Sequence, residues 1–258
     1  MIKKKKYIIR LYSGTGNELF IYAFYRYLIL KFNLNVYLDI KSGIIQNYGT
    51  NPEGTLISLN KLNTKYKVAN NKFCFLGFSG KLSRFYYKFM SKSDFYITEK
   101  SFNIDIKQIV NSKNSFNYIE GYFQDLKFIN PIKKFLIKEI VPVKKSYYFE
   151  RLKKEINFNN SICICYRDFG TVDSNIFKKI DKVLNLPSNK NKDIYIFSNN
   201  TKKLLNKSKN LQKRNFQEVK FNYRKQSIYA LDLMSSFRIF VIGSSTFHWW
   251  GAFLSKKK

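Results

Sequence analysis

The sequence predicts an α/β protein whose sheets are parallel. A glycine turn joins a strand pattern to a helix pattern near the N-terminus, and three apolar runs in the second half each end in polar or small residues. Such runs are typical of strands that are buried on both faces. With 258 residues, 45% of them hydrophobic, the chain is long enough for one large α/β domain or two small ones.

The first half begins with a βαβ pattern. A strand is predicted for residues 7–12, a helix for residues 17–32 with apolar residues at helical spacing, and a second strand that ends at Asp39. Residues 41–115 are mixed in character and predict no clear element. A further strand then leads into "GYFQ", and an amphipathic helix interrupted near Pro131 follows.

The second half contains three strand-like runs, which end at Arg167, Ser198 and Ser245. A charged stretch after Pro142 is predicted to connect the two halves, which gives domains of residues 1–145 and 146–258. Because ligands of open parallel sheets bind outside the carboxyl ends of the strands, the residues at these ends are the first candidates for a site.

The turn "SGTG" permits two interpretations. Gly14 and Gly16 let a ligand approach the backbone, and the N–H groups at the following helix start favour a phosphate or another anion. A glycine turn capped by Asn17 is equally how an ordinary strand joins a helix.

Arg167 and Asp168 follow a buried strand. An arginine in this position can hold a diphosphate through two charge-assisted hydrogen bonds, and the aspartate can accept from a nucleobase or a ribose. The alternative is a surface arrangement of the two side chains that has no function.

The stretch "GSSTFHWWGAFL" contains the single histidine and both tryptophans of the chain. Ser245, Thr246 and the N–H groups of a helix start are suited to phosphate, and Phe247 can wall a flat ring. The two tryptophans are predicted to pack the helix onto the sheet. His248 is either a packing residue or a ligand-binding residue.

The net charge of +30 arises from 47 Lys and Arg against 17 Asp and Glu. Such a positive charge attracts the phosphate groups of a nucleic acid, an anionic lipid or a nucleotide. Alternatively, the excess of lysine is a general property of the surface and has no specific partner. Three cysteines predict no disulfide framework, and the sequence contains neither a membrane-spanning apolar run nor a signal peptide. We therefore expect a cytoplasmic protein, with the lysines at 3–6 and 256–258 available for peripheral contact with an anionic membrane.

Taken in order, the motifs resemble those of the bacterial-type α-1,2-fucosyltransferases, glycosyltransferase family 11. Residues 13–23 are similar to the family's Gly-Gly-x-Gly-Asn-Gln-x-Phe-x-Tyr-Ala, and residues 244–252 to its Asn-Ser-Ser-Phe-Ser-Trp-Trp-Gly-Ala. "GYFQ" at 121–124, "IFS" at 196–198 and "DLM" at 232–234 fall between them, where the family has related motifs. The resemblance spans nearly the whole chain.

The resemblance implies a GT-B-like fold of two Rossmann-type lobes, the first on the acceptor side and the second binding GDP-fucose. It implies an inverting glycosyltransferase that moves fucose to the 2-hydroxyl of a galactose-type acceptor in a surface polysaccharide or glycan. Neither a metal nor another cofactor is expected. Fixed donors and a guanidinium would stabilise the charge that develops on the departing GDP.

The resemblance also assigns residues. Arg167 would clamp the diphosphate and Asn17 would lie by the glycosidic oxygen, and these two are the predicted catalytic residues. The predicted donor-binding residues are Gly14, Gly16, Asp168, Ser198, Ser245, Thr246, Phe247 and His248. Glu18, Asp39 and Glu120 are the candidates for the base that takes the acceptor proton.

The chain departs from the family pattern at several positions. Cys165 and Asp168 replace the His and the second Arg of a His-x-Arg-Arg-Gly-Asp motif, and Glu18 replaces a Gln. The chain ends soon after the last motif, so the donor lobe is expected to lack the family's C-terminal tail. An alternative is therefore a fucosyltransferase-like protein without activity. A further alternative, from charge and aromatic content, is a nucleic-acid or membrane-surface binder; no nucleic acid is expected, since the Tyr and Phe residues mostly follow strand and helix patterns.

Overall fold

The chain folds into two compact units, residues 1–141 and 142–258. The computed structural model describes residues 5–42, 58–70, 74, 89, 93–170 and 174–255. The division falls before the predicted boundary of 145/146. Val141 is the last residue of unit 1, and its carbonyl accepts a hydrogen bond from the N–H of Asn63.

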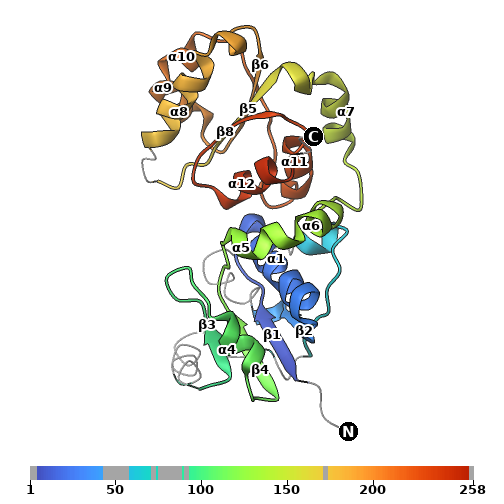
Figure 1. Cartoon of the computed structure of the whole chain (residues 1–258). Helices are drawn as coiled ribbons and strands as arrows, with labels where there is room; N and C mark the ends of the chain where they lie inside the picture. Colours follow the sequence, from blue (N-terminus) through green and yellow to red (C-terminus); the bar gives the residue numbers. More distant parts are fainter. Residues whose placement is uncertain are drawn as a thin grey trace. The chain divides into compact units, whose positions relative to one another are not determined.

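Unit 1 is built on a parallel sheet with the strand order β2-β1-β4-β3 (Figure 1). Its strands are β1 (Lys6–Arg10), β2 (Val36–Asp39), β3 (Tyr96–Thr98) and β4 (Phe116–Glu120). β1 lies at the centre, with Tyr7, Ile8 and Ile9 buried. The short β3 was not predicted, because three residues are too few to show a period within a mixed segment.

The helices in the described part of unit 1 are α1 (Thr15–Phe32), α4 (Ile106–Asn111), α5 (Leu126–Ile129) and α6 (Lys133–Glu139), with 3-10 turns η1 (Ser58–Lys61) and η3 (Asn130–Ile132). α1, α5 and α6 follow the predicted pattern, whereas α4 and η1 lie in the segment 41–115, for which no element was predicted. The interruption predicted near Pro131 is confirmed as η3, which separates α5 from α6. α1 begins at Thr15, not at Asn17, so Gly16 lies inside the first helical turn. Asn33 ends α1 in the left-handed conformation.

Unit 2 contains a second parallel sheet, with the order β7-β6-β5-β8 (Figure 1). Its strands are β5 (Ser161–Tyr166), β6 (Asp193–Ser198), β7 (Gln217–Glu218) and β8 (Ile239–Ile242). The three strands predicted in this half are confirmed, and β5 is buried along its whole length. β7 was not predicted because it has two residues.

Helices cover the sheet of unit 2. They are α7 (Tyr147–Glu155), α8 (Ser174–Leu184), α9 (Thr201–Lys207), α10 (Lys209–Gln212), α11 (Ser227–Met234) and α12 (Thr246–Phe253), with 3-10 turns η4 (Phe158–Asn160) and η5 (Pro187–Asn189). Ile162 and Ile164 of β5 join a core cluster with α8. Cys165, the residue after Ile164, contacts Met234 of α11, with 3.6 Å between the sulfur atoms.

α12 packs tightly against α11. A Cβ atom added at Gly251 would lie 3.0 Å from Cβ of Met234, so the close approach depends on glycine. The Trp250 side chain is fully buried, and the Trp249 ring stacks on Phe253 at 4.9 Å. The burial of Trp250 agrees with the packing role predicted for it, whereas the Trp249–Phe253 contact lies within α12, so the packing of Trp249 onto the sheet stays a prediction.

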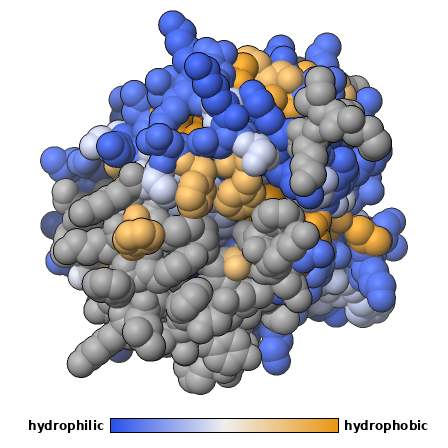
Figure 2. Space-filling model, turned by 90° about the horizontal axis from the view of Figure 1, so that it is seen from below, coloured by the Kyte–Doolittle hydropathy of each residue, from blue (hydrophilic) through white to orange (hydrophobic). Residues whose placement is uncertain are grey.

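The face of the molecule seen in Figure 2 is mostly polar where its residues are described, with apolar residues in small groups. No helix in the described ranges has the length and apolarity needed to span a membrane. The predicted membrane contact involves lysines at 3, 4 and 256–258, which lie outside the described residues. All three cysteines are buried free thiols.

Candidate functional site

The β1–α1 turn of unit 1 leaves space for a ligand. Ser13 has the left-handed conformation, with φ 78°, whereas Gly14 and Gly16 do not. Gly14 is extended (φ −88°, ψ 170°) and is the N-cap residue of α1. A Cβ atom at Gly14 would have no atom within 4 Å, whereas Gly16 is buried in the helix. Gly14 is thus the one of the two glycines whose surface is open to an approaching molecule.

Asn17 lies between this turn and the elbow that follows β4. Its Nδ2 donates to Oγ of Ser13 at 2.9 Å, and its Oδ1 accepts from Nε2 of Gln124 at 3.0 Å. The amide orientation of Asn17 is therefore fixed from two sides. Gln124 belongs to the "GYFQ" motif but was not among the predicted site residues. It lies beside Asn17 because β1 and β4 are neighbours in the sheet, and sequence patterns do not reveal this pairing.

An ion pair joins the carboxyl ends of β1 and β4. Nη1 of Arg10 lies 2.8 Å from Oε1 of Glu120, and the side chains are 8% and 16% exposed. The hydroxyl of Tyr96 donates to the other carboxylate oxygen. Burial raises the pKa of Glu120 above its ordinary value, and the neighbouring Arg10 opposes this shift.

The two other candidate bases are held in structural roles. Glu18 is buried and accepts a hydrogen bond from the N–H of Ser58 at 2.8 Å; burial raises its pKa to about 8. Asp39 is fully buried and accepts hydrogen bonds from the hydroxyls of Tyr118 and Ser42. Of the three carboxyl groups, Glu120 is the one that keeps measurable exposure at the edge of the sheet.

The elbow after β4 is held by Glu99. Its carboxylate accepts hydrogen bonds from the N–H groups of Tyr122 at 2.7 Å and Phe123 at 3.0 Å. A Cβ atom at Gly121 would lie 2.5 Å from Cβ of Glu99, so this position has room only for glycine. The ring of Tyr122 lies 4.9 Å from that of Tyr12, on the β1 side of the same edge.

In unit 2, Arg167 projects from the carboxyl end of β5 over an aromatic ring. Its guanidinium carbon lies 4.0 Å from the centroid of Tyr223, a cation–π arrangement. The Tyr223 hydroxyl is buried without a hydrogen-bond partner among the described residues, and burial raises its pKa. The sequence did not point to Tyr223, because this residue lies in a connection between β7 and α11 that carries no periodic signal.

His248 lies in the first turn of α12 and is fully buried. Neither ring nitrogen has a hydrogen-bond partner within the described part of the chain. Burial, with a smaller effect of the Arg167 charge, lowers its pKa to about 3, so the imidazole is neutral near pH 7. A neutral imidazole offers one donor and one acceptor, and the described residues use neither of them.

The start of α12 is also without a side-chain cap. Ser245 is the N-cap residue, yet its hydroxyl makes no capping hydrogen bond. The first N–H groups of a helix have no intrahelical partner, and together with the helix dipole they attract an anion. Thr246 is partly exposed, whereas Phe247 is buried with its ring 5.8 Å from that of Tyr223.

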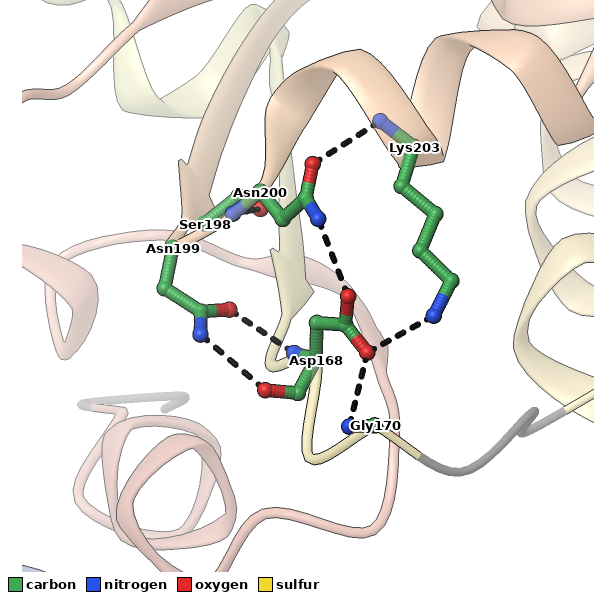
Figure 3. A network of polar contacts seen from close by, with 6 residues as sticks. All are labelled: Asp168, Gly170, Ser198, Asn199, Asn200 and Lys203. Carbon is green, nitrogen blue, oxygen red and sulfur yellow. Dashed lines mark hydrogen bonds and ion pairs between the residues drawn. The ribbon is translucent and has the colours of Figure 1, made fainter.

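Asp168 belongs to a network that ties the loop after β5 to the loop after β6 (Figure 3). Its carboxylate accepts from Nζ of Lys203 at 2.8 Å, from Nδ2 of Asn200 at 2.9 Å and from the N–H of Gly170 at 3.0 Å. The hydrogen bond from Lys203 lowers the pKa of Asp168. The oxygens of Asp168 are thus already used by protein donors, and its predicted contact with the donor substrate stays a prediction.

Ser198 lies at the end of β6, next to the same network. Its Oγ accepts a hydrogen bond from the N–H of Asn200 at 2.9 Å, which shapes the loop (Figure 3). Among the described residues, no three His, Cys, Asp or Glu side chains gather as a metal site. The expectation of a metal-free reaction stays a prediction.

The predicted residues therefore gather at the carboxyl edge of each sheet. Gly14 and Asn17 lie at the edge of unit 1, beside the Arg10–Glu120 pair. Those of unit 2 come from the ends of three neighbouring strands. They are Arg167, Asp168, Ser198, Ser245, Thr246, Phe247 and His248.

No protein-family model and no curated protein matches this sequence. Solved structures of fucosyltransferases are similar in fold, each at 12% identity. NodZ from Bradyrhizobium has a TM-score of 0.56 over 96% of this chain and 92% of its own. An α-1,6-fucosyltransferase NodZ soaked with GDP-fucose has a TM-score of 0.53 over 98% and 93%. FUT1 of Arabidopsis thaliana, a variant in complex with GDP, has a TM-score of 0.50 over 99% and 70%. The expected GT-B-like α/β architecture is thus confirmed.

Proposed function

We propose that this chain is an inverting glycosyltransferase that moves fucose from GDP-fucose to the 2-hydroxyl of a galactose-type acceptor in a glycan. The observation that carries the proposal is the edge of unit 2, where Arg167 and the uncapped start of α12 lie beside His248, which is buried and has no hydrogen-bond partner among the described residues. Fold similarity to proteins whose structures hold GDP or GDP-fucose supports the same nucleotide.

Arg167 and α12 supply what a diphosphate leaving group requires. As the bond between fucose C1 and the β-phosphate oxygen breaks, the electron pair stays on GDP. A guanidinium and preorganised N–H groups stabilise that charge more in the transition state than in the ground state. Stacking on Tyr223 holds the guanidinium in place before the donor arrives. His248 adds a neutral donor or acceptor at the same edge.

Glu120 is the proposed base. The acceptor oxygen forms its bond to C1 of fucose while its proton passes to the Glu120 carboxylate. Because the pKa of Glu120 is raised, it lies closer to neutral pH than that of an ordinary glutamate, which suits general-base catalysis. Asn17 and Gln124 would orient the acceptor through their linked amides.

The linkage rests on the motifs at residues 13–23 and 244–252, which resemble α-1,2 enzymes. One similar structure is of an α-1,6 enzyme. The product of the reaction with a galactoside acceptor decides between the two, since NMR of the disaccharide identifies the substituted carbon.

Thermal unfolding with nucleotides tests the donor. A ligand that binds only the folded protein stabilises it by about 2.7 kcal/mol at a hundredfold excess over Kd. We expect millimolar GDP to raise the melting temperature by several degrees and UDP to raise it less. Arg167→Ala should abolish the GDP effect, whereas Arg151→Ala, which removes an exposed arginine of α7 in the same unit, should preserve it. An unchanged melting temperature of the wild type with GDP contradicts the proposal.

A second candidate is a protein with this fold that does not turn over. Two observations favour it: the oxygens of Asp168 are occupied by protein donors, and Cys165 is buried against sulfur. GDP stabilisation without release of GDP from GDP-fucose, either to water or to an acceptor, would identify this case. Measurable turnover excludes it.

We further propose that the protein works in the cytoplasm, where a GDP-sugar is available, with its basic surface near an anionic membrane. Its acceptor would then belong to a surface polysaccharide assembled at the membrane. Co-sedimentation with vesicles that contain phosphatidylglycerol, but not with neutral vesicles, is the expected result. Binding to neither kind of vesicle contradicts the membrane part of the proposal.

A further inference from the structure

A cavity of about 710 Å³ lies in unit 1 at the amino ends of β1 and β2. Its lining includes Lys5 and Tyr7 at the start of β1, and Asn35 and Val36 at the start of β2. The glycine turn lies at the other end of β1. Since a strand rises about 3.3 Å per residue, the two regions are roughly 15 Å apart. The cavity is therefore separate from the candidate site.

The charge of the cavity is positive. Its lining contains Lys5, Arg26, Lys65 and Lys67, and none of the described lining residues is acidic. Glu139 binds one arginine nitrogen, Nη2 of Arg26, at 2.7 Å. Nε of Arg26 is buried and has no hydrogen-bond partner among the described residues. A concave surface with this excess of cations concentrates anions.

Aromatic and amide side chains share the lining with these cations. They are Tyr7, Tyr25, Tyr66, Asn33 and Asn35. Tyr7 and Tyr25 are each 2% exposed, so Tyr66, which is partly exposed, is the tyrosine of this lining whose flat apolar face a ligand can reach. The carboxamides both donate and accept hydrogen bonds. The faces of a sugar ring and its hydroxyl groups match this combination, whereas a bare anion needs only the cations.

Lys65 and Lys67, two of the basic residues that line the cavity, are held in place through their backbone. The N–H of Lys65 donates to the hydroxyl of Tyr22 and the N–H of Lys67 to that of Tyr25, each at 3.0 Å. These bonds fix the segment through its backbone, and both lysines are exposed. The backbone position of this segment therefore does not depend on the two ammonium groups, of which that of Lys67 lies 5.7 Å from the centroid of the Tyr37 ring.

We propose that this cavity binds an acidic saccharide, a sugar unit that carries a carboxylate or a phosphate. The cations hold the anionic group through charge-assisted hydrogen bonds, and Tyr66, Asn33 and Asn35 hold the ring and its hydroxyls. This binding does not depend on fucosyl transfer.

Calorimetric titration at low salt tests the proposal with three probes: trigalacturonate, its neutral methyl ester, and citrate. The wild type should bind trigalacturonate at least about tenfold more tightly than the ester or citrate, a difference of about 1.4 kcal/mol. The double variant Lys65→Ala/Lys67→Ala should lose about tenfold in affinity for trigalacturonate. The matched control Lys178→Ala/Lys182→Ala removes two exposed lysines of α8 and should bind as the wild type does.

A variant that keeps the charge separates the sugar from the anion. Tyr66→Leu should weaken trigalacturonate binding and leave citrate binding unchanged. Equal binding of citrate and trigalacturonate by the wild type would reduce the cavity to an anion site and overturn the proposal. So would equal binding of the methyl ester, or an unaltered affinity in the Lys65/Lys67 double variant. Vesicles of phosphatidylglycerol that bind through these two lysines, when trigalacturonate does not bind, would assign the cavity to a lipid headgroup instead.

Discussion

Arg10 and Glu120 form an ion pair of 2.8 Å between the carboxyl ends of two neighbouring parallel strands. The pair keeps a carboxylate at the edge of the sheet, beside the turn that carries Gly14 and Asn17. It also gives Arg10, which is 7% exposed, the counter-charge that a buried guanidinium needs. One contact therefore serves both the stability of unit 1 and the proposed chemistry.

Glu120→Gln should reduce fucosyl transfer by about 10²–10⁴-fold, the usual effect of losing a general base. GDP binding should be unchanged, because the amide oxygen still accepts a hydrogen bond from Arg10 and the fold survives. Steady-state kinetics with GDP-fucose and a thermal shift with GDP measure the two effects. In the wild type, the rate should increase with pH as this carboxyl group loses its proton. Full activity of the variant would remove Glu120 from the mechanism.

Glu18→Gln should change the pH dependence of stability. The folded pKa of Glu18, about 8, lies above the ordinary value of 4.5, so the folded protein binds an extra proton between these two pH values. The free energy of unfolding of the wild type therefore falls with rising pH in this window, by about 1.4 kcal/mol per pH unit for this group. The stabilising contribution of the protonated Glu18 is complete only below pH 4.5. Glutamine removes this dependence. Denaturant unfolding at pH 5 and pH 8 should show that the variant gains stability relative to the wild type at pH 8, and an equal difference at both pH values refutes the assignment.

Gly121→Ala should destabilise unit 1 by about 2–4 kcal/mol, because the new methyl group overlaps Cβ of Glu99 in the elbow. Gly14→Ala is the matched control, since its backbone angles suit alanine and the space around it is open. Its melting temperature should stay within a degree or two of the wild type. If Gly14 lies against a substrate, the same variant loses turnover. Equal stability of the two variants would contradict the geometry of the elbow.

His248→Phe should reduce the loss of folding stability at acidic pH. The folded pKa of about 3 lies below the ordinary 6.5, so the stability that the neutral ring provides is complete above pH 6.5 and is lost as the pH falls from there towards 3. Phenylalanine has no such proton to bind. The variant should therefore lose less stability than the wild type between pH 7 and pH 5 in denaturant unfolding. Parallel losses would mean that the imidazole accepts its proton without penalty.

Long apolar runs made unit 2 predictable. The runs of β5 and β6 are six residues long and bounded by polar residues, and the structure reproduces them. In unit 1, the glycine turn and the interruption at Pro131 were also predictable, because glycine permits backbone conformations that other residues avoid and proline fixes φ and removes an N–H donor. β3 and β7 were not predicted, because two or three residues show no periodicity and because their place in a sheet depends on the neighbouring strands.

The site was only partly predictable for a related reason. Arg167 and the start of α12 are found at strand ends, which a sequence shows directly. The contact of Arg167 with Tyr223 and that of Asn17 with Gln124 depend on which segments become neighbours in space. Likewise, the three candidate bases could not be ranked until their burial and partners were known. The left-handed residue of the β1–α1 turn was also unexpected, because it is Ser13 and not a glycine.

The strand order of unit 1 has a consequence for how this protein is made. β1 pairs on one side with β2, which follows soon after in the chain, and on the other with β4, whose Glu120 lies 110 positions beyond Arg10. During synthesis, the central strand therefore emerges early and keeps one open edge until β4 has left the ribosome. Pairing over such a sequence separation is slow, and an unpaired apolar strand is prone to aggregate. The basic surface, through like-charge repulsion between nascent chains, counteracts this hazard.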